Sequence, residues 1–443
     1  MALLFVPRKV FALVMAGASC LSIASCGGSE RHSSNVPGAA VPAERVSRFE
    51  APEPFFPRGE GTELGLDSDA LSALIASAQA SRSDALILIK EGHVVVERYF
   101  GHRPRPIATM SVTKGIVSLA IGALIDEKKI ASIDAPLATW FPEWAEGRKA
   151  SVTLRHVMTH TSGLEHQGPA RKLYDQADRL AYARQLPVVE QPGKRVSYNN
   201  EAVELLSGIV RIAAGKPLDD YMREKFFTPM GIVDFTWDKD KAGNVQAFAD
   251  LKLFPRDLAK FGQLMLDGGR WNGQQLVSST WIAQSTSPAR ADSEIGLLWW
   301  VAYTSLEYVQ SAATREAFGQ WGFTASSKLA PLDGRIFNNA TNYYETATAL
   351  LTNDEMSSLF RVRGLPDSPK LFDVRRGEPI GFHHDGSNGQ FLLVYRPWHI
   401  VAVRLHDPGD EPLETLAQYM AEEREHGFSG FPEAVRATVR RGK

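Results

Sequence analysis

A serine and a lysine whose spacing suits catalysis lie in the first third of the chain, at Ser111 and Lys114. On a helix, residues three apart lie one turn apart on the same face, so the lysine would stand beside the serine hydroxyl. A serine hydroxyl becomes a strong nucleophile only when a neighbouring base removes its proton, and a lysine in apolar surroundings can be that base. The apolar residues 116–120 predict such surroundings. The alternative for this motif taken alone is a helix-capping serine beside a solvated lysine.

A second candidate element is Tyr198-Asn199-Asn200, the only Tyr-x-Asn in the chain. A phenol oxygen near Lys114 could pass the serine proton to a leaving group, as general acid–base catalysis requires. The amide of Asn200 could bond both Lys114 and a substrate amide. The alternative is that Asn200 only caps the helix predicted over residues 201–214.

A third candidate element precedes a predicted strand near residue 391, and it consists of His384, Asp385, Gly386 and Ser387. A glycine on an edge strand lets a substrate backbone approach closely. The backbone N–H groups of Ser387 and Ser111 would together form an oxyanion hole. Three adjacent residues rarely converge on one ion, so we predict no metal site at 383–385.

Strands at both ends of the chain must position these elements. Residues 85–89 with 94–99, and 391–395 with 400–404, predict two β-hairpins, and Ser111 opens an apolar helix to about Asp126. The stretch of about 130–285 is mostly helical in pattern, and a last helix is expected over 412–425. We therefore predict an α/β protein of the α+β kind. Its one antiparallel sheet is built from both chain ends and is flanked by helices, and a mainly helical domain is inserted between the strands. Residues 303–379 are longer than a strand connection needs, and we interpret them as an insertion that either borders the cleft or decorates the periphery.

The N-terminus carries the order of an export signal. Arg8 and Lys9 precede an apolar stretch rich in small residues, which ends at Cys26. This stretch is too short to span a membrane comfortably. It resembles the signal of bacterial lipoproteins, in which cleavage occurs before the cysteine and the thiol is acylated. We therefore expect a signal peptide over 1–25, a lipid anchor at Cys26, a flexible tether over 26–63 and a folded domain over 64–443. The expected location is the periplasmic side of a bacterial membrane, and Gly27 favours the outer one.

The composition excludes some classes of function. The chain has 443 residues, 44% of them hydrophobic, and a formal net charge of -2. A nucleic-acid-binding domain usually carries a strongly basic face, which this balance does not indicate. We expect no nucleic-acid partner and no cofactor.

The three elements in this order resemble the serine β-lactamase and penicillin-binding-protein superfamily, nearest its class C, esterase and D-aminopeptidase branch. Residues 155–164 and 254–262 match that branch as well. The resemblance implies that Ser111 forms an acyl-enzyme and that Lys114 and Tyr198 share the general-base role. It also implies that His156 and His160, whose spacing would suit a metal pair, are structural.

The third element departs from the pattern of the superfamily, in which Lys-Thr-Gly or His-Thr-Gly often receives a substrate carboxylate. Asp385 in the middle position would repel a carboxylate if it faced the cleft, at a cost of about 4 kcal/mol for like charges about 4 Å apart. The sequence thus favours a hydrolase of neutral or amine-bearing small esters or amides. The alternatives are a D,D-carboxypeptidase or β-lactamase, and a non-catalytic binding lipoprotein on the same fold.

Overall fold

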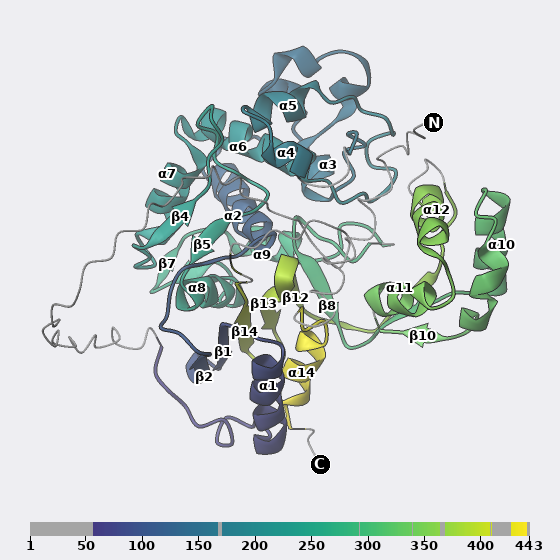
Figure 1. Ribbon diagram of the computed structural model, residues 1–443. Coiled ribbons are helices and arrows are strands. Elements are labelled where there is room, and N and C mark those ends of the chain that lie inside the picture. Colours follow the sequence, from purple (N-terminus) through teal and green to yellow (C-terminus); the bar gives the residue numbers. More distant parts are fainter. Residues whose placement is uncertain are drawn as a thin grey trace, which may run out of the picture.

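The structure is a computed structural model that describes residues 56–166, 171–291, 293–338, 340–363, 368–407, 409 and 427–440. At its centre is a six-stranded antiparallel sheet in the order β2-β1-β14-β13-β12-β8 (Figure 1). The strands are β1 (Ala85–Lys90), β2 (His93–Tyr99), β8 (Trp300–Tyr303), β12 (Pro379–Gly386), β13 (Gln390–Tyr395) and β14 (Ile400–Leu405).

The first and last strands of the chain meet in the middle of this sheet. β1 pairs with β14 so that Ala85 lies opposite Leu405. The turn between β1 and β2 contains Glu91 and Gly92, both with positive φ, the backbone shape that a tight hairpin requires. The prediction of one sheet built from both chain ends is confirmed.

Helices cover both faces of the sheet. On one face lie α2 (Val112–Asp126) and α8 (Pro255–Leu266), and on the other lie α1 (Ser68–Ala80) and α14 (Phe431–Ala437). Every residue of β1, β13 and β14 is buried, which explains why these strands are continuous apolar runs rather than alternating ones.

Apart from α2 and α8, the chain between β2 and β8 forms a mainly helical region, at the top and left of Figure 1. Its longest helix, α6, ends at Gly215, whose φ of 70° closes the helix in the left-handed conformation. The region also holds a small three-stranded sheet that the sequence pattern did not predict. The helices are α3 (Leu154–Met158), α4 (Arg171–Tyr174), α5 (Arg179–Gln185), α6 (Asn200–Ala214), α7 (Leu218–Met222) and α9 (Ser279–Ser285), the short helical turns are η2 (Leu137–Thr139), η3 (Pro142–Trp144), η4 (Gly147–Ser151) and the π-helical η5 (Arg223–Phe227), and the short strands are β3 (Ile107–Ala108), β4 (Phe235–Trp237), β5 (Leu251–Leu253), β6 (Arg270–Trp271) and β7 (Gln274–Gln275).

The chain between β8 and β12 forms a separate unit at the right of Figure 1. It has its own three-stranded sheet, in the order β10-β9-β11, and its own apolar core around Tyr343, Tyr344 and Phe372. Its elements are β9 (Leu306–Val309), α10 (Ala312–Gln320), η6 (Ser326–Leu332), β10 (Ile336–Phe337), α11 (Ala340–Thr348), α12 (Asn353–Arg363) and β11 (Asp373–Arg376). We call residues 304–378 the insertion.

Three expectations about the chain ends meet different outcomes. The signal peptide, Cys26 and most of the tether lie outside the described residues, as does the helix expected over 412–425. The packed chain begins earlier than residue 64, because Phe56 packs edge-on against Trp271 and Arg58 pairs with Val94. No helix in the described part of the chain is long and apolar enough to span a membrane.

Candidate active site

Ser111 stands at the N-terminus of α2, where the chain enters the helix from Met110 in a left-handed conformation, with φ of 46°. Its side chain makes no capping hydrogen bond. Instead Lys114 Nζ donates to Ser111 Oγ at 2.8 Å, and both residues are completely buried. The alternative of a capping serine beside a solvated lysine is therefore wrong.

Lys114 is fixed by a second contact, since its Nζ donates to the carbonyl oxygen of Phe248 at 2.7 Å. The segment that carries this carbonyl is held in turn by Glu204, whose buried carboxyl group accepts from the backbone N–H of Ala247 at 2.9 Å. The carbonyl of Phe248 could not be predicted from residue types, because any residue can supply a backbone carbonyl. These contacts hold the lysine against the serine and leave its Nζ little freedom.

Tyr198 reaches the same place from the segment before α6. Lys114 Nζ lies 4.8 Å from the centroid of the Tyr198 ring. The ring of His160 also lies against that of Tyr198, at 4.4 Å between centroids and 31° between planes. The first two elements of the sequence prediction therefore meet in space.

His160 holds the segment around Tyr198 from both sides. Its Nδ1 accepts from the backbone N–H of Asn199 at 3.2 Å, and its carbonyl oxygen accepts from the N–H of Ser197 at 2.7 Å. Burial, and to a smaller extent the charge of Lys114, lowers the pKa of His160 well below its usual value, so the imidazole is neutral. With Nδ1 as acceptor, the proton is on Nε2. The sequence resemblance made His160 structural, and the structure shows what it supports.

The helix cap of α6 is not the residue expected. Asn199 accepts from the N–H of Ala202 at 2.7 Å and donates to the carbonyl of Leu164 at 2.9 Å. Asn200 is instead the first residue of α6, and it is buried. Capping therefore does not account for Asn200. His156 contacts a different segment from His160, since its Nδ1 accepts from the backbone N–H of Thr153 at 3.1 Å.

The third element meets the nucleophile through Gly386, the last residue of β12. A Cβ at this position would lie 2.9 Å from the backbone N of Ser111 and 2.9 Å from the carbonyl oxygen of Thr109. Only glycine permits so close an approach. The buried Ser387 follows directly, so its backbone stands at the start of α2, as the prediction of a shared oxyanion hole requires.

His384 faces the interior. Its Nδ1 donates to the carbonyl oxygen of Asp385 at 2.7 Å. Burial lowers the pKa of His384 to about 3, with Asp385 opposing the shift and the charge of Lys114 adding to it. The imidazole beside the catalytic pair is therefore neutral, and it adds no charge there.

Asp385 does not lie where the substrate argument needs it. In the pairing of β12 with β13, Asp385 lies opposite Phe391 and His384 lies opposite Leu392. Directly opposite residues share one face of a sheet. Phe391 belongs to the core on the side of α1 and α14, whereas Leu392 belongs to the core on the side of α2.

The carboxylate of Asp385 therefore projects from the face of the sheet opposite α2. There it lies 3.4 Å from Nδ1 of His383. Burial acts to raise the pKa of Asp385, but the bond and the charge of His383 outweigh it, so the pKa is lowered. The expected repulsion of a substrate carboxylate by Asp385 does not apply to this arrangement.

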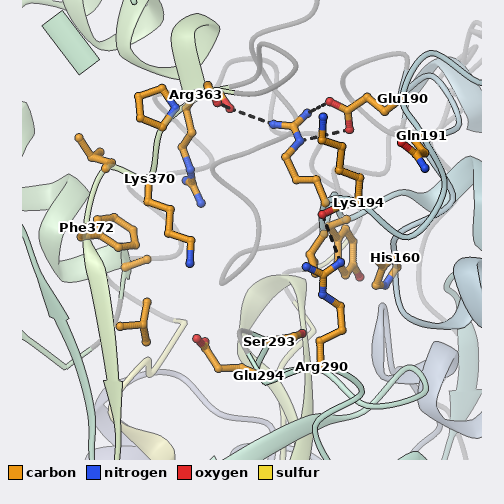
Figure 2. Close-up of a pocket in the computed structure, with 18 of the residues that line it drawn as sticks. His160, Glu190, Gln191, Lys194, Arg290, Ser293, Glu294, Arg363, Lys370 and Phe372 are labelled. Atoms are coloured by element: carbon orange, nitrogen blue, oxygen red, sulfur yellow. Dashed lines mark hydrogen bonds and ion pairs between the residues drawn. The ribbon is translucent and has the colours of Figure 1, made fainter. Parts of the chain in front are cut away.

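A cavity of about 1040 Å³ opens beside the candidate site (Figure 2). His160 and Tyr198 line it, together with most of the loop 189–196 that precedes Tyr198. The rest of the described lining includes Arg290, Ser293 and Glu294, and from the insertion Arg363, residues 368–374 and Arg376. Its volume suits a small-molecule substrate. The insertion thus forms one wall of the cavity.

Comparison with known proteins places this geometry in a family. The family model described as Beta-lactamase matches residues 71–406, so the chain belongs to the Beta-lactamase family. The resemblance inferred from the three short elements is confirmed.

The curated relatives and solved structures are distant. "Esterase EstB" of Burkholderia gladioli is 29% identical over 210 residues, which are 39% of this chain and 53% of that protein. "Putative D-alanyl-D-alanine carboxypeptidase" of Escherichia coli K12 is 22% identical over 47% of this chain and 62% of that protein. A solved putative beta-lactamase from Bacteroides dorei DSM 17855 has the same fold, with a TM-score of 0.57 and 16% identity over 85% of this chain and all of the other. The chain thus matches little more than half the length of these curated relatives.

Proposed function

We propose that the protein is a serine hydrolase that cleaves ester or amide bonds through an acyl-enzyme on Ser111. The observation that carries the proposal is the 2.8 Å contact between Lys114 Nζ and Ser111 Oγ, buried at the N-terminus of a helix. A buried amine held on a hydroxyl, beside a tyrosine ring, has the relation of base to nucleophile that covalent catalysis needs.

The reaction runs in two halves. Ser111 Oγ attacks the substrate carbonyl and gives its proton to the Lys114–Tyr198 pair, which passes it to the departing alcohol or amine. Water then attacks the acyl-enzyme, and its proton returns through the same pair to Ser111 as the acid leaves. The backbone N–H groups of Ser111 and Ser387 stabilise the oxyanion in each half, and the amide of Asn200 binds a substrate amide. Lys114 and Tyr198 act as one coupled base.

The test is hydrolysis of p-nitrophenyl butyrate by the full chain and by Ser111→Ala. The expected result is turnover by the wild type and background rates for the variant. A matched control is Ser118→Ala, since Ser118 lies on the same helix, is buried, and donates only to the carbonyl of Leu297. Equal activity of the wild type and Ser111→Ala would show that Ser111 is not the nucleophile.

A peptidase activity is the second candidate, and it is favoured by the name of the Escherichia coli relative. Release of D-alanine from a peptide ending in D-Ala-D-Ala, with no hydrolysis of the butyrate ester, would replace the esterase proposal with this one.

We propose further that the protein is exported and held on the periplasmic side of a bacterial membrane by acylation of Cys26. The support is the signal-like order of the first residues. Labelling of cells with radioactive palmitate should mark the wild type and leave Cys26→Ser unmarked.

A further inference from the structure

The cavity that His160 and Tyr198 line is strongly basic, although the whole chain carries a net charge of -2. Seven cationic side chains line it against three carboxylates. The cations are Arg148, Lys194, Arg195, Arg290, Arg363, Lys370 and Arg376, and the carboxylates are Glu190, Glu294 and Asp373. The described lining therefore has an excess of four positive charges.

Two of the three carboxylates are already matched within the lining itself. Arg195 pairs with Glu190 at 2.7 Å, and Arg376 pairs with Glu294 at 2.8 Å. Backbone carbonyls hold two further guanidinium groups of the lining in place. Arg290 donates to the carbonyls of Gly193 and Lys194, and Arg148 donates to that of Val189.

The positive charges come from two opposite walls. Figure 2 shows Arg363 and Lys370 of the insertion on one side of the cavity, and Lys194 and Arg290 on the other. Charges of one sign that face each other across a hollow repel, so this arrangement costs stability unless an anion sits between them. Arg is also the side chain that best matches a planar carboxylate.

We propose that the substrate is an acidic ester or amide, with one or more carboxylates remote from the scissile bond that bind between Lys370 and Arg363 of the insertion and the basic loop before Tyr198. This proposal deepens the proposed function and rests on it. It replaces the preference for neutral or amine-bearing substrates, because Asp385 lies on the far face of the sheet and does not line the cavity.

The proposal also assigns a role to the insertion. Its wall adds Arg363, Lys370 and Arg376 to the cavity, whereas the contacts described for Ser111 come from Lys114 and Gly386. Substrate selection would therefore reside in a unit separate from the chemistry.

The test compares three sets of 4-nitrophenyl esters on the full chain. The acyl chains end in a carboxylate (the glutarate, adipate and suberate monoesters), in the matching neutral methyl ester, or in the matching primary amine. We expect kcat/KM to be at least tenfold higher for the best carboxylate ester than for its neutral partner, and lowest for the amine. The preference should shrink in 1 M NaCl, where the screening length falls to about 3 Å.

Charge variants locate the effect. Lys370→Gln and Arg363→Gln should each reduce the carboxylate preference about fivefold while leaving the rate on the neutral ester within about twofold. The matched control is Arg375→Gln, because Arg375 lies on the same strand of the insertion as Arg376, is exposed, and is absent from the cavity lining. It should keep the full preference. A loss in Arg375→Gln equal to that in Lys370→Gln would refute the cavity as the source.

A binding measurement separates this proposal from the proposed function. Fluorescein-labelled tetraglutamate and tetralysine are titrated with the full chain and followed by anisotropy. Equal hydrolysis of all three ester types would overturn the acidic substrate and leave the hydrolase intact. Absence of hydrolysis of the esters and of a peptide ending in D-Ala-D-Ala, with tight, Lys370-dependent binding of tetraglutamate, would overturn the hydrolase and leave the acidic site. Absence of both would overturn both.

Discussion

Replacement of Gly386 by alanine should separate the two chain segments that meet at the nucleophile. The new Cβ would lie 2.9 Å from each of three atoms, the N of Ser111, the O of Thr109 and the Cβ of Met110, whereas ordinary contacts begin at 3.4 Å. Two of these atoms are backbone, so rotation of a side chain cannot relieve the crowding. The end of β12 must therefore move about 0.5 Å away from the start of α2.

The size of the effect follows from that displacement. A misplacement of about 1 Å at a reacting centre costs about 100-fold in rate, so 0.5 Å should cost about tenfold. Overpacking of a buried site costs about 1–3 kcal/mol of stability. We therefore expect Gly386→Ala to remain folded at room temperature with kcat lowered about tenfold, because the amide of Ser387 no longer stands in line with that of Ser111.

The assay is the p-nitrophenyl butyrate rate per active molecule, counted by fluorophosphonate labelling of Ser111, together with a thermal melt. The matched control is Gly381→Ala on the same strand, whose Cβ would meet the carbonyl oxygen of Val394 instead. It should lose stability while its remaining folded molecules keep their kcat. The reasoning fails if Gly386→Ala keeps its kcat within twofold of the wild type.

Three further changes test other contacts of the site. Lys114→Met removes the amine from Ser111 Oγ and should lower kcat by about 10²–10⁴-fold; a smaller loss in a steady-state assay would make Tyr198 the main base. His160→Asn suits the φ of 53° at that position but removes the ring from Tyr198, so kcat should fall more than KM changes, and an unchanged kcat would contradict the positioning role. Burial raises the pKa of Glu204 from 4.5 to about 8, although the hydrogen bond from the N–H of Ala247 acts to lower it. As pH rises, the unfolded chain therefore loses this proton before the folded chain does. The stability that the protonated carboxyl contributes is full below pH 4.5 and is lost as pH rises through 8. Between pH 5 and pH 9, thermal melts should therefore show a smaller loss of stability for Glu204→Gln than for the wild type. Equal losses in the two proteins would show that Glu204 is already ionised.

The residues of the site could be predicted where their types and spacing indicate a chemical role. Ser111 and Lys114 are three apart on a helix whose apolar run is visible in the sequence, and the structure places Nζ on Oγ. The sheet could be predicted because its central strands are continuous apolar runs at the two chain ends. Tyr198 and Gly386 were found through motifs, and their convergence on α2 needed the structure.

The face on which Asp385 lies could not be predicted, because alternation tells which residues of a strand share a face but not which face meets the site. The start of β12 is irregular as well, since simple alternation would put Ile380 and Phe382 on one face. The pairing of β12 with β8 shifts register between Pro379 and Gly381, so Ile380 joins the core beside α1 while Phe382 joins the core beside α2. A bulge of this kind leaves no mark in the pattern of residue types.

The basic cavity was missed for a different reason. Its cations come from stretches around residues 148, 194, 290 and 363–376, and no stretch is basic enough to attract notice alone. A whole-chain balance near zero conceals them, because acidic residues elsewhere offset them in the sum but not in space.

The pairing of the first strand with the last also orders events during synthesis. Ala85 cannot pair until Leu405, 320 positions later in the chain, has been synthesised. At about 5–20 residues per second, synthesis of the chain between them takes roughly 16 to 64 s. Until then the apolar β1 has one open edge, which exposes the nascent chain to aggregation. Ser111 is made early, but Gly386 and Ser387 arrive late, so the growing chain carries the proposed nucleophile before the backbone that the proposed oxyanion hole needs. Activity should therefore appear only when the last strand is in place, which protects the compartment of synthesis from an unfinished hydrolase.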